Sequence, residues 1–275
     1  MADCIGGASS AFSARYGMAM DDFGLWNETL ATMLTHRTVR AFRPESLPEG
    51  IVETLAAAAQ SAPTSSNLQS WSVLAVVDPV RKARLAEWSG RQTQVVEAPL
   101  LLIWLADLSR AERLGERGGR TMEALPYAEA QIVAMMDAAF AAQNALVAAE
   151  SLGLGACYLG ALRNHPEWVA AELGLPPRCF PVFGLCVGWP DEQRPAVLRP
   201  RLPQSVVVHR ERYDVSREET EIGLYDSRFR VHQGETGLPQ SGWVARVMER
   251  LATVAGLNGR DIMRGALERL GFTLQ

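Results

Sequence analysis

The stretch Leu100-Leu101-Leu102-Ile103-Trp104-Leu105 is a near-continuous apolar run with the length of a β-strand. A strand with one solvated face alternates apolar and polar residues, and this run has no such alternation. It therefore predicts a strand in a sheet that other elements cover on both faces.

Three more strands and several helices are predicted around this run. The strands are expected over residues 71–77, 156–159 and 181–188. Helices are expected over residues 25–34, from Ser46 to just before Pro63, over 79–88, over a long stretch ending at Gly153, from Asn164 onward, after Arg201, and from a cap at Asn258 through Leu270. Few strands among many helices, without strict βαβ alternation, predict an α+β fold.

Length and composition indicate how the chain is organised. Its 275 residues are 48% hydrophobic and 21% charged, which is typical of a globular protein. Residues 1–23 are rich in small side chains and show little periodicity, so we expect a loose N-terminal extension. Residues 24–275 are expected to form a single domain with a helical C-terminal part.

The charge argues against one class of partner. Lys and Arg total 27 against 31 Asp and Glu, a net charge of −4 that does not favour general nucleic-acid binding. Nearly all the positive charge is arginine, since Lys82 is the one lysine in the chain. Arginine suits two-pronged recognition of anions, so arginines near loop motifs are candidate binding residues.

Three further features favour a cytoplasmic protein. The cysteines form no C-x-x-C pair and are expected to be buried free thiols in a reducing compartment; they are Cys4, Cys157, Cys179 and Cys186. No secretory leader is evident. The apolar stretch from Ala130 to Gly153 is interrupted by polar residues, among them Asp137 and Glu150, which favours a buried helix over a membrane span.

Several familiar chemical motifs are absent from the sequence. The four histidines have no metal-ligand spacing, and there is no H-E-x-x-H, no G-x-S-x-G and no Walker A loop. Gly153-Leu154-Gly155 follows a helix and precedes a strand, the reverse of the order in a dinucleotide fingerprint. We therefore expect no metal site and no Rossmann domain.

Three polar segments each allow two interpretations. Arg37 and Arg40 are either solvated residues at a helix C-terminus or two guanidinium groups directed at one anion. Residues 61–71, rich in hydroxyl and amide groups, form either a simple turn or a loop that binds a cofactor. Arg199-Pro200-Arg201 is either a polar linker or a stiffened pair of phosphate-binding arginines.

Taken together, six segments resemble a known family in their order and spacing. The segments are His36–Arg40, Thr64–Gln69, Ser89–Gln92, Gly155–Ala161, Phe183–Pro190 and Arg199–Pro203. They resemble the FMN-dependent nitroreductases of the larger group A type, the oxygen-insensitive NADPH nitroreductases and flavin reductases. The resemblance covers Leu25 to Tyr213.

The resemblance implies a fold and a cofactor site. It implies a nitroreductase-like α+β sandwich with a central, mainly antiparallel sheet flanked by helices, in an intertwined homodimer that binds FMN at the subunit interface. The cofactor-binding residues it implies are His36, Arg37, Thr38, Arg40, Thr64, Ser65, Ser66, Leu68, Gln92, Tyr158, Leu159, Gly160, Ala161, Arg199 and Arg201. Arg199 and Arg201 would complete the phosphate clamp, and Gln92 would bind the pyrimidine edge of the flavin. Some residues of the Thr64–Leu68 segment would come from the partner subunit.

The resemblance also implies an activity. The protein would reduce small acceptors, nitroaromatics and quinones, by two-electron ping-pong transfer from NAD(P)H. It would need no catalytic side chain, because the hydride passes through flavin N5. Two alternatives remain: an NADPH flavin reductase that supplies reduced FMN, and a flavin-binding protein with little turnover. Residues 233–243, comparable to an arginine-rich NADPH-binding stretch of the family, contain no arginine here, so the preference for NADPH over NADH stays open.

Overall fold

The computed structural model describes residues 2–17, 26–273 and 275, and the side chains from residue 9 onward. The chain divides into two compact units. The helical unit consists of the described parts of Met1–Arg37 together with Val197–Asn258. The sheet unit consists of Thr38–Ala196 and the described part of Gly259–Gln275.

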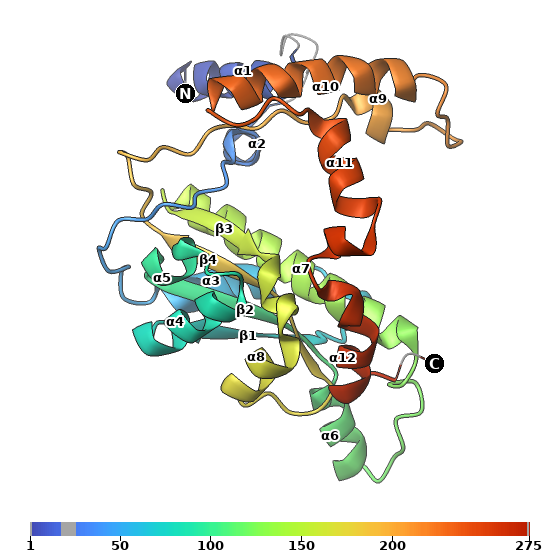
Figure 1. Cartoon of the computed structure of the whole chain (residues 1–275). Helices are drawn as coiled ribbons and strands as arrows, with labels where there is room; N and C mark the ends of the chain where they lie inside the picture. Colours follow the sequence, from blue (N-terminus) through green and yellow to red (C-terminus); the bar gives the residue numbers. More distant parts are fainter. Residues whose placement is uncertain (1, 18–25, 274) are drawn as a thin grey trace. The chain divides into compact units, whose positions relative to one another are not determined.

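The sheet unit is built on a four-stranded antiparallel sheet in the order β1-β2-β4-β3 (Figure 1). The strands are β1 (Trp71–Val76), β2 (Leu100–Asp107), β3 (Gly155–Leu159) and β4 (Cys179–Gly188). The predicted strands are therefore confirmed, as is the mainly antiparallel α+β sheet. β4 begins two residues earlier than expected and β2 extends two residues further.

Strand β2 is covered on both faces, as its unbroken apolar run predicts. All eight of its residues are buried. Leu100, Leu102 and Trp104 belong to one hydrophobic cluster with helices α3 (Ile51–Gln60) and α7 (Ala128–Ser151). The alternate residues belong to a second cluster, which includes side chains from α4 (Pro79–Trp88) and α5 (Thr93–Glu97). The sheet therefore lies between two helical layers.

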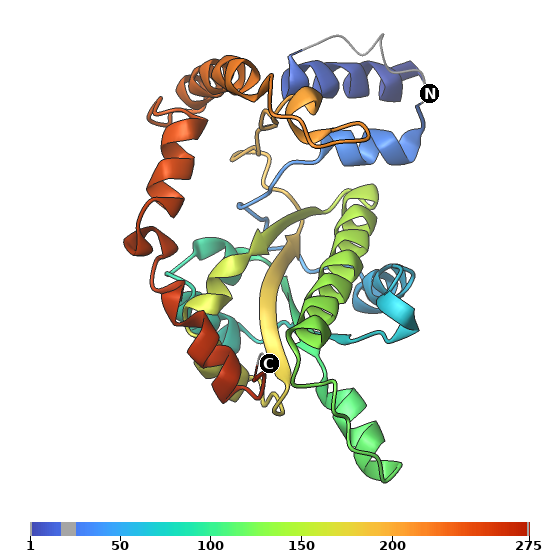
Figure 2. The same ribbon diagram turned by 90° about the vertical axis from the view of Figure 1, so that its right-hand side faces the viewer.

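Helix α7 lies along the sheet (Figure 2) and packs against α3. Its alanines at positions 134, 138, 141, 142 and 145 are fully buried, and their small side chains allow the close approach. By length and composition α7 is apolar enough to cross a membrane, but half of its most apolar window is buried inside the protein. Such burial is typical of the core helix that the sequence predicts.

The one lysine of the chain fastens helix α5 to helix α4. Lys82 on α4 is buried, and its Nζ donates to the backbone oxygen of Ala98 at 2.6 Å and of Val96 at 3.3 Å. These carbonyls lie at the C-terminal end of α5, where a cation is favoured.

The remaining elements of the sheet unit are shorter. They are η2 (Ser65–Asn67), α6 (Ser109–Arg117), η3 (Gly160–Asn164), α8 (Pro166–Glu172), η5 (Arg260–Ile262) and α12 (Met263–Arg269). Two predicted helix starts are wrong in detail. The helix expected from Ser46 begins at Ile51, after Gly50 in a left-handed conformation (φ 79°). His165 rather than Asn164 precedes α8, because the Asn164 side chain accepts a hydrogen bond from Arg260.

The helical unit contains no strand among its described residues. Its elements are α1 (Ala2–Tyr16), α2 (Glu28–Thr35), α9 (Gln204–Val207), α10 (Glu218–Glu235), α11 (Trp243–Leu251) and η4 (Val254–Leu257). Asn258, expected to cap the last helix, instead ends η4 in a left-handed conformation (φ 53°).

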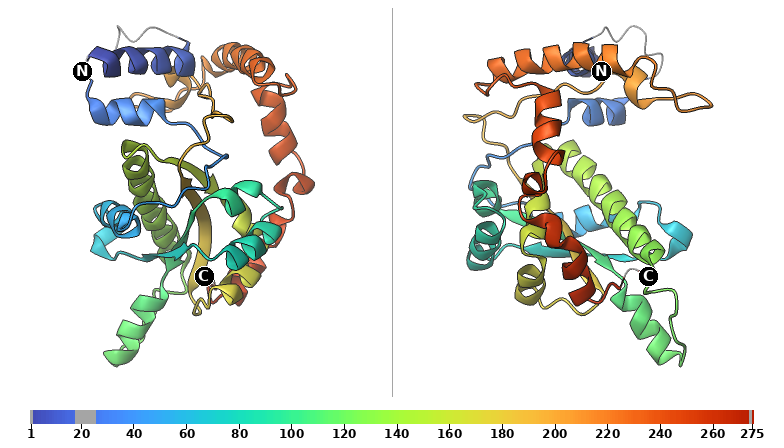
Figure 3. Two further views of the ribbon diagram at one scale, coloured as in Figure 1. Left: turned by 90° about the vertical axis from the view of Figure 1, so that its left-hand side faces the viewer. Right: turned by 45° about the vertical axis from the view of Figure 1, so that its right-hand side comes forward.

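The N-terminal segment differs from the loose extension expected over residues 1–23. Residues 2–16 form α1, which runs beside α2 (Figure 3). Ala11, Phe12 and Arg15 are buried on this helix, and that burial accounts for its order. Residues 18–23 lie outside the described part of the chain.

Candidate functional site

Four predicted site residues lie in the helical unit, and one buried side chain connects the two segments that carry them. Arg15 is only 4% exposed. Its Nη2 donates to the backbone oxygen of His36 at 2.6 Å, and its Nη1 to that of Arg199 at 3.5 Å. The segments of His36–Arg37 and Arg199–Arg201, separate in sequence, are therefore held together by a residue that sequence analysis missed.

The backbone of Arg199-Pro200-Arg201 is fixed residue by residue. The N–H of Arg201 donates to the oxygen of Arg15 at 2.8 Å. Tyr225 Oη donates to the Pro200 oxygen at 3.3 Å, and Arg228 Nη2 to the Arg201 oxygen at 2.9 Å. A segment held in this way presents its arginine side chains from a rigid support. Tyr225 and Arg228 also went unrecognised in the sequence.

Two arginines of this cluster, Arg37 and Arg201, have no carboxylate partner among the described residues. The side chain of Arg201 donates only to carbonyls of its own segment. Burial, and then the charge of Arg199, lowers the pKa of His232. Cations without acidic partners are suited to hold a phosphate group.

Thr38 and Arg40 lie in the sheet unit, along the free edge of β3. Thr38 forms a parallel bridge with Ala156, and the N–H of Val39 donates to the Ala156 oxygen at 3.0 Å. Gly155 permits this approach, because a Cβ there would lie 2.6 Å from the Val39 side chain. Thr38 and Val39 of the first predicted motif thus lie directly beside the Gly155–Ala161 motif.

The end of β3 can offer a ligand its backbone more than its side chains. Leu159 and Ala161 are 1% and 6% exposed, so their side chains are committed to the core. Tyr158 is 38% exposed and its ring meets Phe183 edge-on at 5.2 Å. Burial, with Glu150 nearby, raises the pKa of Tyr158, which remains a neutral phenol. The backbone approach to the flavin ring predicted for Tyr158–Ala161 stays a prediction.

The Thr64–Gln69 loop has an unusual backbone. Ser66, Asn67 and Gln69 have φ angles of 49°, 56° and 52°, in the left-handed region that residues other than glycine seldom adopt. Leu68 is 62% exposed at the loop tip. The hydroxyl groups of the loop are therefore presented by a conformation that the rest of the protein has to hold in place.

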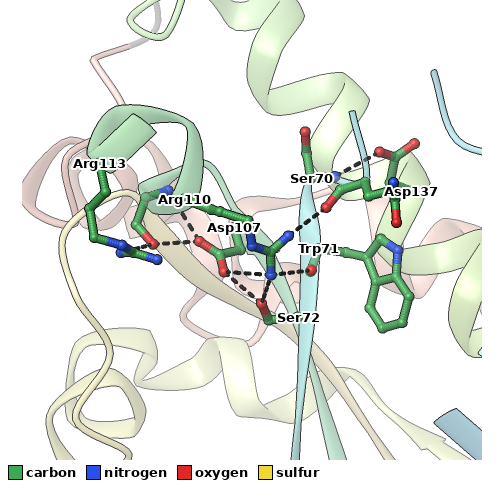
Figure 4. A network of polar contacts seen from close by, with 9 residues as sticks. Ser70, Trp71, Ser72, Asp107, Arg110, Arg113 and Asp137 are labelled. Carbon is green, nitrogen blue, oxygen red and sulfur yellow. Dashed lines mark hydrogen bonds and ion pairs between the residues drawn. The ribbon is translucent and has the colours of Figure 1, made fainter. Parts of the chain in front are cut away.

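Two side chains outside the loop hold it (Figure 4). Asp137 on α7 is 1% exposed and accepts the N–H of Ser65 at 3.1 Å and of Ser70 at 3.0 Å. Figure 4 shows the bond between Asp137 and Ser70. Arg110 on α6 donates to the Gln69 oxygen at 2.8 Å. Neither residue was identified from the sequence, where Asp137 served only as a polar interruption in an apolar helix.

Gln92 lies at the start of α5 and is already engaged within its own turn. Its Nε2 donates to the Ser89 oxygen at 3.0 Å, and its Oε1 accepts from Gln94. It lines a groove of about 490 Å³ together with residues of α4 and α5. Among the described residues, no hydrogen bond or strand pairing joins Gln92 or Tyr158 to the Thr64–Gln69 loop.

The described cysteines are free and buried, as predicted. They are Cys157, Cys179 and Cys186, and the side chain of Cys4 lies outside the described part of the chain. Burial, with Asp107 nearby, raises the pKa of Cys179 to about 12, so this thiol is not a nucleophile at neutral pH.

Comparison with known proteins identifies the class. The model of the nitroreductase family matches residues 33–189, and the model of its C-terminal domain matches residues 199–275. The chain belongs to the nitroreductase family, which confirms the resemblance. The two matches contain five of the six motifs and all of Phe183–Pro190 except its last residue. The gap between them falls where the sheet unit passes into the helical unit.

Individual relatives lie within the same group. The chain is 39% identical over 194 residues to the FMN reductase (NADPH) of Bacillus subtilis, covering 70% of this chain and 77% of the relative. It is 36% identical over 200 residues to the oxygen-insensitive NADPH nitroreductase of Salmonella typhimurium, covering 73% and 80%. The structure of the NADPH:FMN oxidoreductase from Vibrio harveyi, complexed with NAD+, superposes with a TM-score of 0.80 at 31% identity, covering 90% of this chain and 100% of that one.

Proposed function

We propose that this protein is an FMN-dependent NAD(P)H oxidoreductase that reduces nitroaromatics and quinones by two-electron ping-pong transfer. The observation that carries the proposal is the Arg15-linked cluster of His36, Arg37, Arg199 and Arg201, cationic and built on a fixed backbone. The names of the Bacillus, Salmonella and Vibrio relatives support both the flavin and the nicotinamide donor.

The residues named by the family resemblance suit FMN in their chemistry. His36, Arg37, Thr38 and Arg40 would approach the FMN phosphate, ribityl chain and ring edge, and Arg199 and Arg201 would complete the phosphate clamp. The remaining cofactor contacts would come from Thr64, Ser65, Ser66, Leu68 and Gln92, with the backbone of Tyr158, Leu159, Gly160 and Ala161 near the ring. When bound, FMN supplies the centre that accepts and passes on hydride, so the chain itself supplies binding, orientation and positive charge.

A homodimer forms part of this proposal. Helix α7 exposes Ile132, Met136 and Phe140 by 51%, 42% and 48%. Their four-residue spacing places them in one apolar stripe, which is typical of a helix face that packs against a partner. A second copy of the chain is the proposed partner, and its Thr64–Leu68 segment would complete the cofactor site. Met136→Glu should convert a dimer to a monomer in analytical ultracentrifugation.

The cytoplasm is the proposed location. Cys157, Cys179 and Cys186 are reduced, buried thiols, and such thiols are typical of reducing compartments.

The proposal is tested by a spectrum and a titration. The purified protein, or the protein mixed with FMN, should absorb as a flavoprotein and should bleach when NADPH is added without oxygen. A parallel titration with NADH measures the donor preference. Colourless protein that fails to take up FMN would contradict the proposal, and a yellow protein that does not bleach would identify a flavin-binding protein with little turnover.

A second test addresses the phosphate clamp. Replacing both Arg199 and Arg201 by alanine should release FMN, because each charge-assisted contact contributes about 1.5–3 kcal/mol. Unchanged FMN affinity in this double variant, measured by fluorescence quenching, would refute the residue assignment.

A flavin reductase is the second candidate function, favoured by the name of the Bacillus relative. Turnover of nitrofurazone, menadione and free FMN should be compared under identical conditions. We expect the first two to be reduced efficiently. Reduction of free FMN alone would favour the second candidate.

A further inference from the structure

Asp137 presents a carboxylate in a place where a charge is costly. It lies in the middle of α7, is 1% exposed, and has no cationic partner among the residues that the structure describes. Burying a charge without a counter-ion is unfavourable unless hydrogen bonds compensate for the lost water. The recorded partners of Asp137 are two backbone N–H groups.

Those two N–H groups mark the ends of one loop. Oδ1 accepts from Ser65 at 3.1 Å and Oδ2 from Ser70 at 3.0 Å. Within the segment that they enclose, the Leu68 N–H donates to the Ser65 oxygen at 2.9 Å, and Gln69 Nε2 donates to Asn67 Oδ1 at 3.2 Å. One carboxylate therefore closes the loop across its base, with one oxygen for each end.

The enclosed backbone needs such support. Three of its residues, Ser66, Asn67 and Gln69, are held in the left-handed region, at a conformational cost for each. A loop released from Asp137 would relax toward ordinary φ values and would move its hydroxyl groups. Asparagine cannot replace aspartate here, because its amide has only one acceptor oxygen and would direct an N–H toward the second N–H.

We infer that Asp137 is a positioning residue for cofactor binding: it sets the conformation in which the Ser65–Gln69 loop contacts FMN. The inference rests on the proposed FMN function. Arg110, which donates to the Gln69 oxygen at 2.8 Å from outside the loop, provides a second and more exposed fastening.

The experiment compares Asp137→Asn with a matched control, Asp226→Asn. Asp226 on α10 is also a buried aspartate, 9% exposed, and it accepts the N–H of Val244 at 2.8 Å. Unlike Asp137, it also pairs with Arg230 at 2.9 Å. FMN affinity is measured by fluorescence quenching, and amide hydrogen exchange is followed in peptides covering residues 64–70 and strand β2. We expect Asp137→Asn to weaken FMN binding by about tenfold or more and to accelerate exchange in residues 64–70 but not in β2. Saturating FMN should restore turnover, whereas Asp226→Asn should leave FMN affinity and loop exchange unchanged.

The outcomes separate this inference from the proposed function. FMN affinity of Asp137→Asn equal to that of the unaltered protein would overturn the inference and leave the proposed function intact. Failure of the unaltered protein to bind FMN would overturn the proposed function and the inference with it. If Asp137→Asn does not fold, Arg110→Met releases the other fastening from a half-exposed site. A several-fold loss of FMN affinity in that variant would support the inference, and unchanged affinity would overturn it.

Discussion

Each of the two units of this protein is stabilised internally, and the main interactions differ between them. In the sheet unit, all of β2 is buried between two apolar clusters, so cohesion comes mainly from hydrophobic burial. In the helical unit, Arg15 and Arg228 donate to backbone oxygens of segments far apart in the chain. Hydrogen bonds of this kind have a small net free energy but fixed geometry. The sheet unit is therefore stabilised mainly by its apolar core, whereas hydrogen bonds in the helical unit fix the positions of a few charged segments.

The largest effect should follow from damage to the apolar core. Phe180 on β4 is fully buried and packs edge-on against Phe272 at 6.3 Å. Phe180→Ala should lower the free energy of unfolding by about 3–5 kcal/mol, because it leaves a cavity. Urea unfolding followed by circular dichroism measures this. Val77→Ala, at a position that is 63% exposed, is the control and should change stability by less than about 0.5 kcal/mol.

A smaller loss of stability but a larger loss of cofactor affinity should follow from Arg15→Met. This change removes the donors to His36 and Arg199 and leaves part-buried carbonyls without these partners, at a cost of about 1–3 kcal/mol. FMN affinity should fall by about tenfold or more, since the phosphate-binding segments lose their common support. Arg15→Lys keeps the charge without the planar fork and should be intermediate. Unchanged FMN affinity in the Arg15→Met protein would contradict the claim that hydrogen bonds in the helical unit fix the phosphate-binding segments.

A polar contact in the sheet unit should contribute less to the free energy of unfolding than the two sites above. Ser72 Oγ donates to Asp107 Oδ2 at 2.6 Å, and Ser72→Ala should cost about 1 kcal/mol at neutral pH. Burial acts to raise the pKa of Asp107, but hydrogen bonds from Ser109 and Ser72 outweigh it and lower that pKa. The contribution is therefore present above the ordinary aspartate pKa and is lost as the pH falls through the folded value. Chemical unfolding at neutral and acid pH should show the cost shrinking in acid, and a constant cost would contradict this account.

The smallest effect concerns His232 in the helical unit. Burial, and then the charge of Arg199, lowers its pKa in the folded state. The unfolded chain then binds more protons, so stability rises with pH and is lost as the pH falls below the ordinary histidine value. His232→Gln should reduce the difference in melting temperature between slightly alkaline and mildly acidic buffer. An unchanged difference would exclude His232 as a source of acid sensitivity.

The same contrast explains what could be predicted from the sequence. The run Leu100–Leu105 is apolar at every position, and such a run has few structural solutions, so the strands and their double cover were predictable. Site motifs were recognisable where a family pattern fixes their residue types. Arg15, Asp137 and Arg228 were not, because each bonds to backbone atoms of distant segments, and a backbone atom leaves no mark in the sequence.

Helix predictions from local residue types were wrong where contacts with distant segments determine the structure. Ser46 and Pro48 have the residue types of a helix start, yet α3 begins only at Ile51, after Gly50. Helix α1 lacks a clear apolar stripe and was read as a loose extension, but its order comes from packing beside α2. Intrinsic preference is a weak guide wherever a segment is stabilised from outside.

The burial of Lys82 has a practical consequence for work with this protein. Its amine is the one side-chain amine of the chain, and it is enclosed between α4 and the end of α5. Acylating dyes and amine-coupled surfaces therefore find no exposed lysine on the native fold. Covalent labelling at position 82 would instead report, molecule by molecule, how often the sheet unit opens.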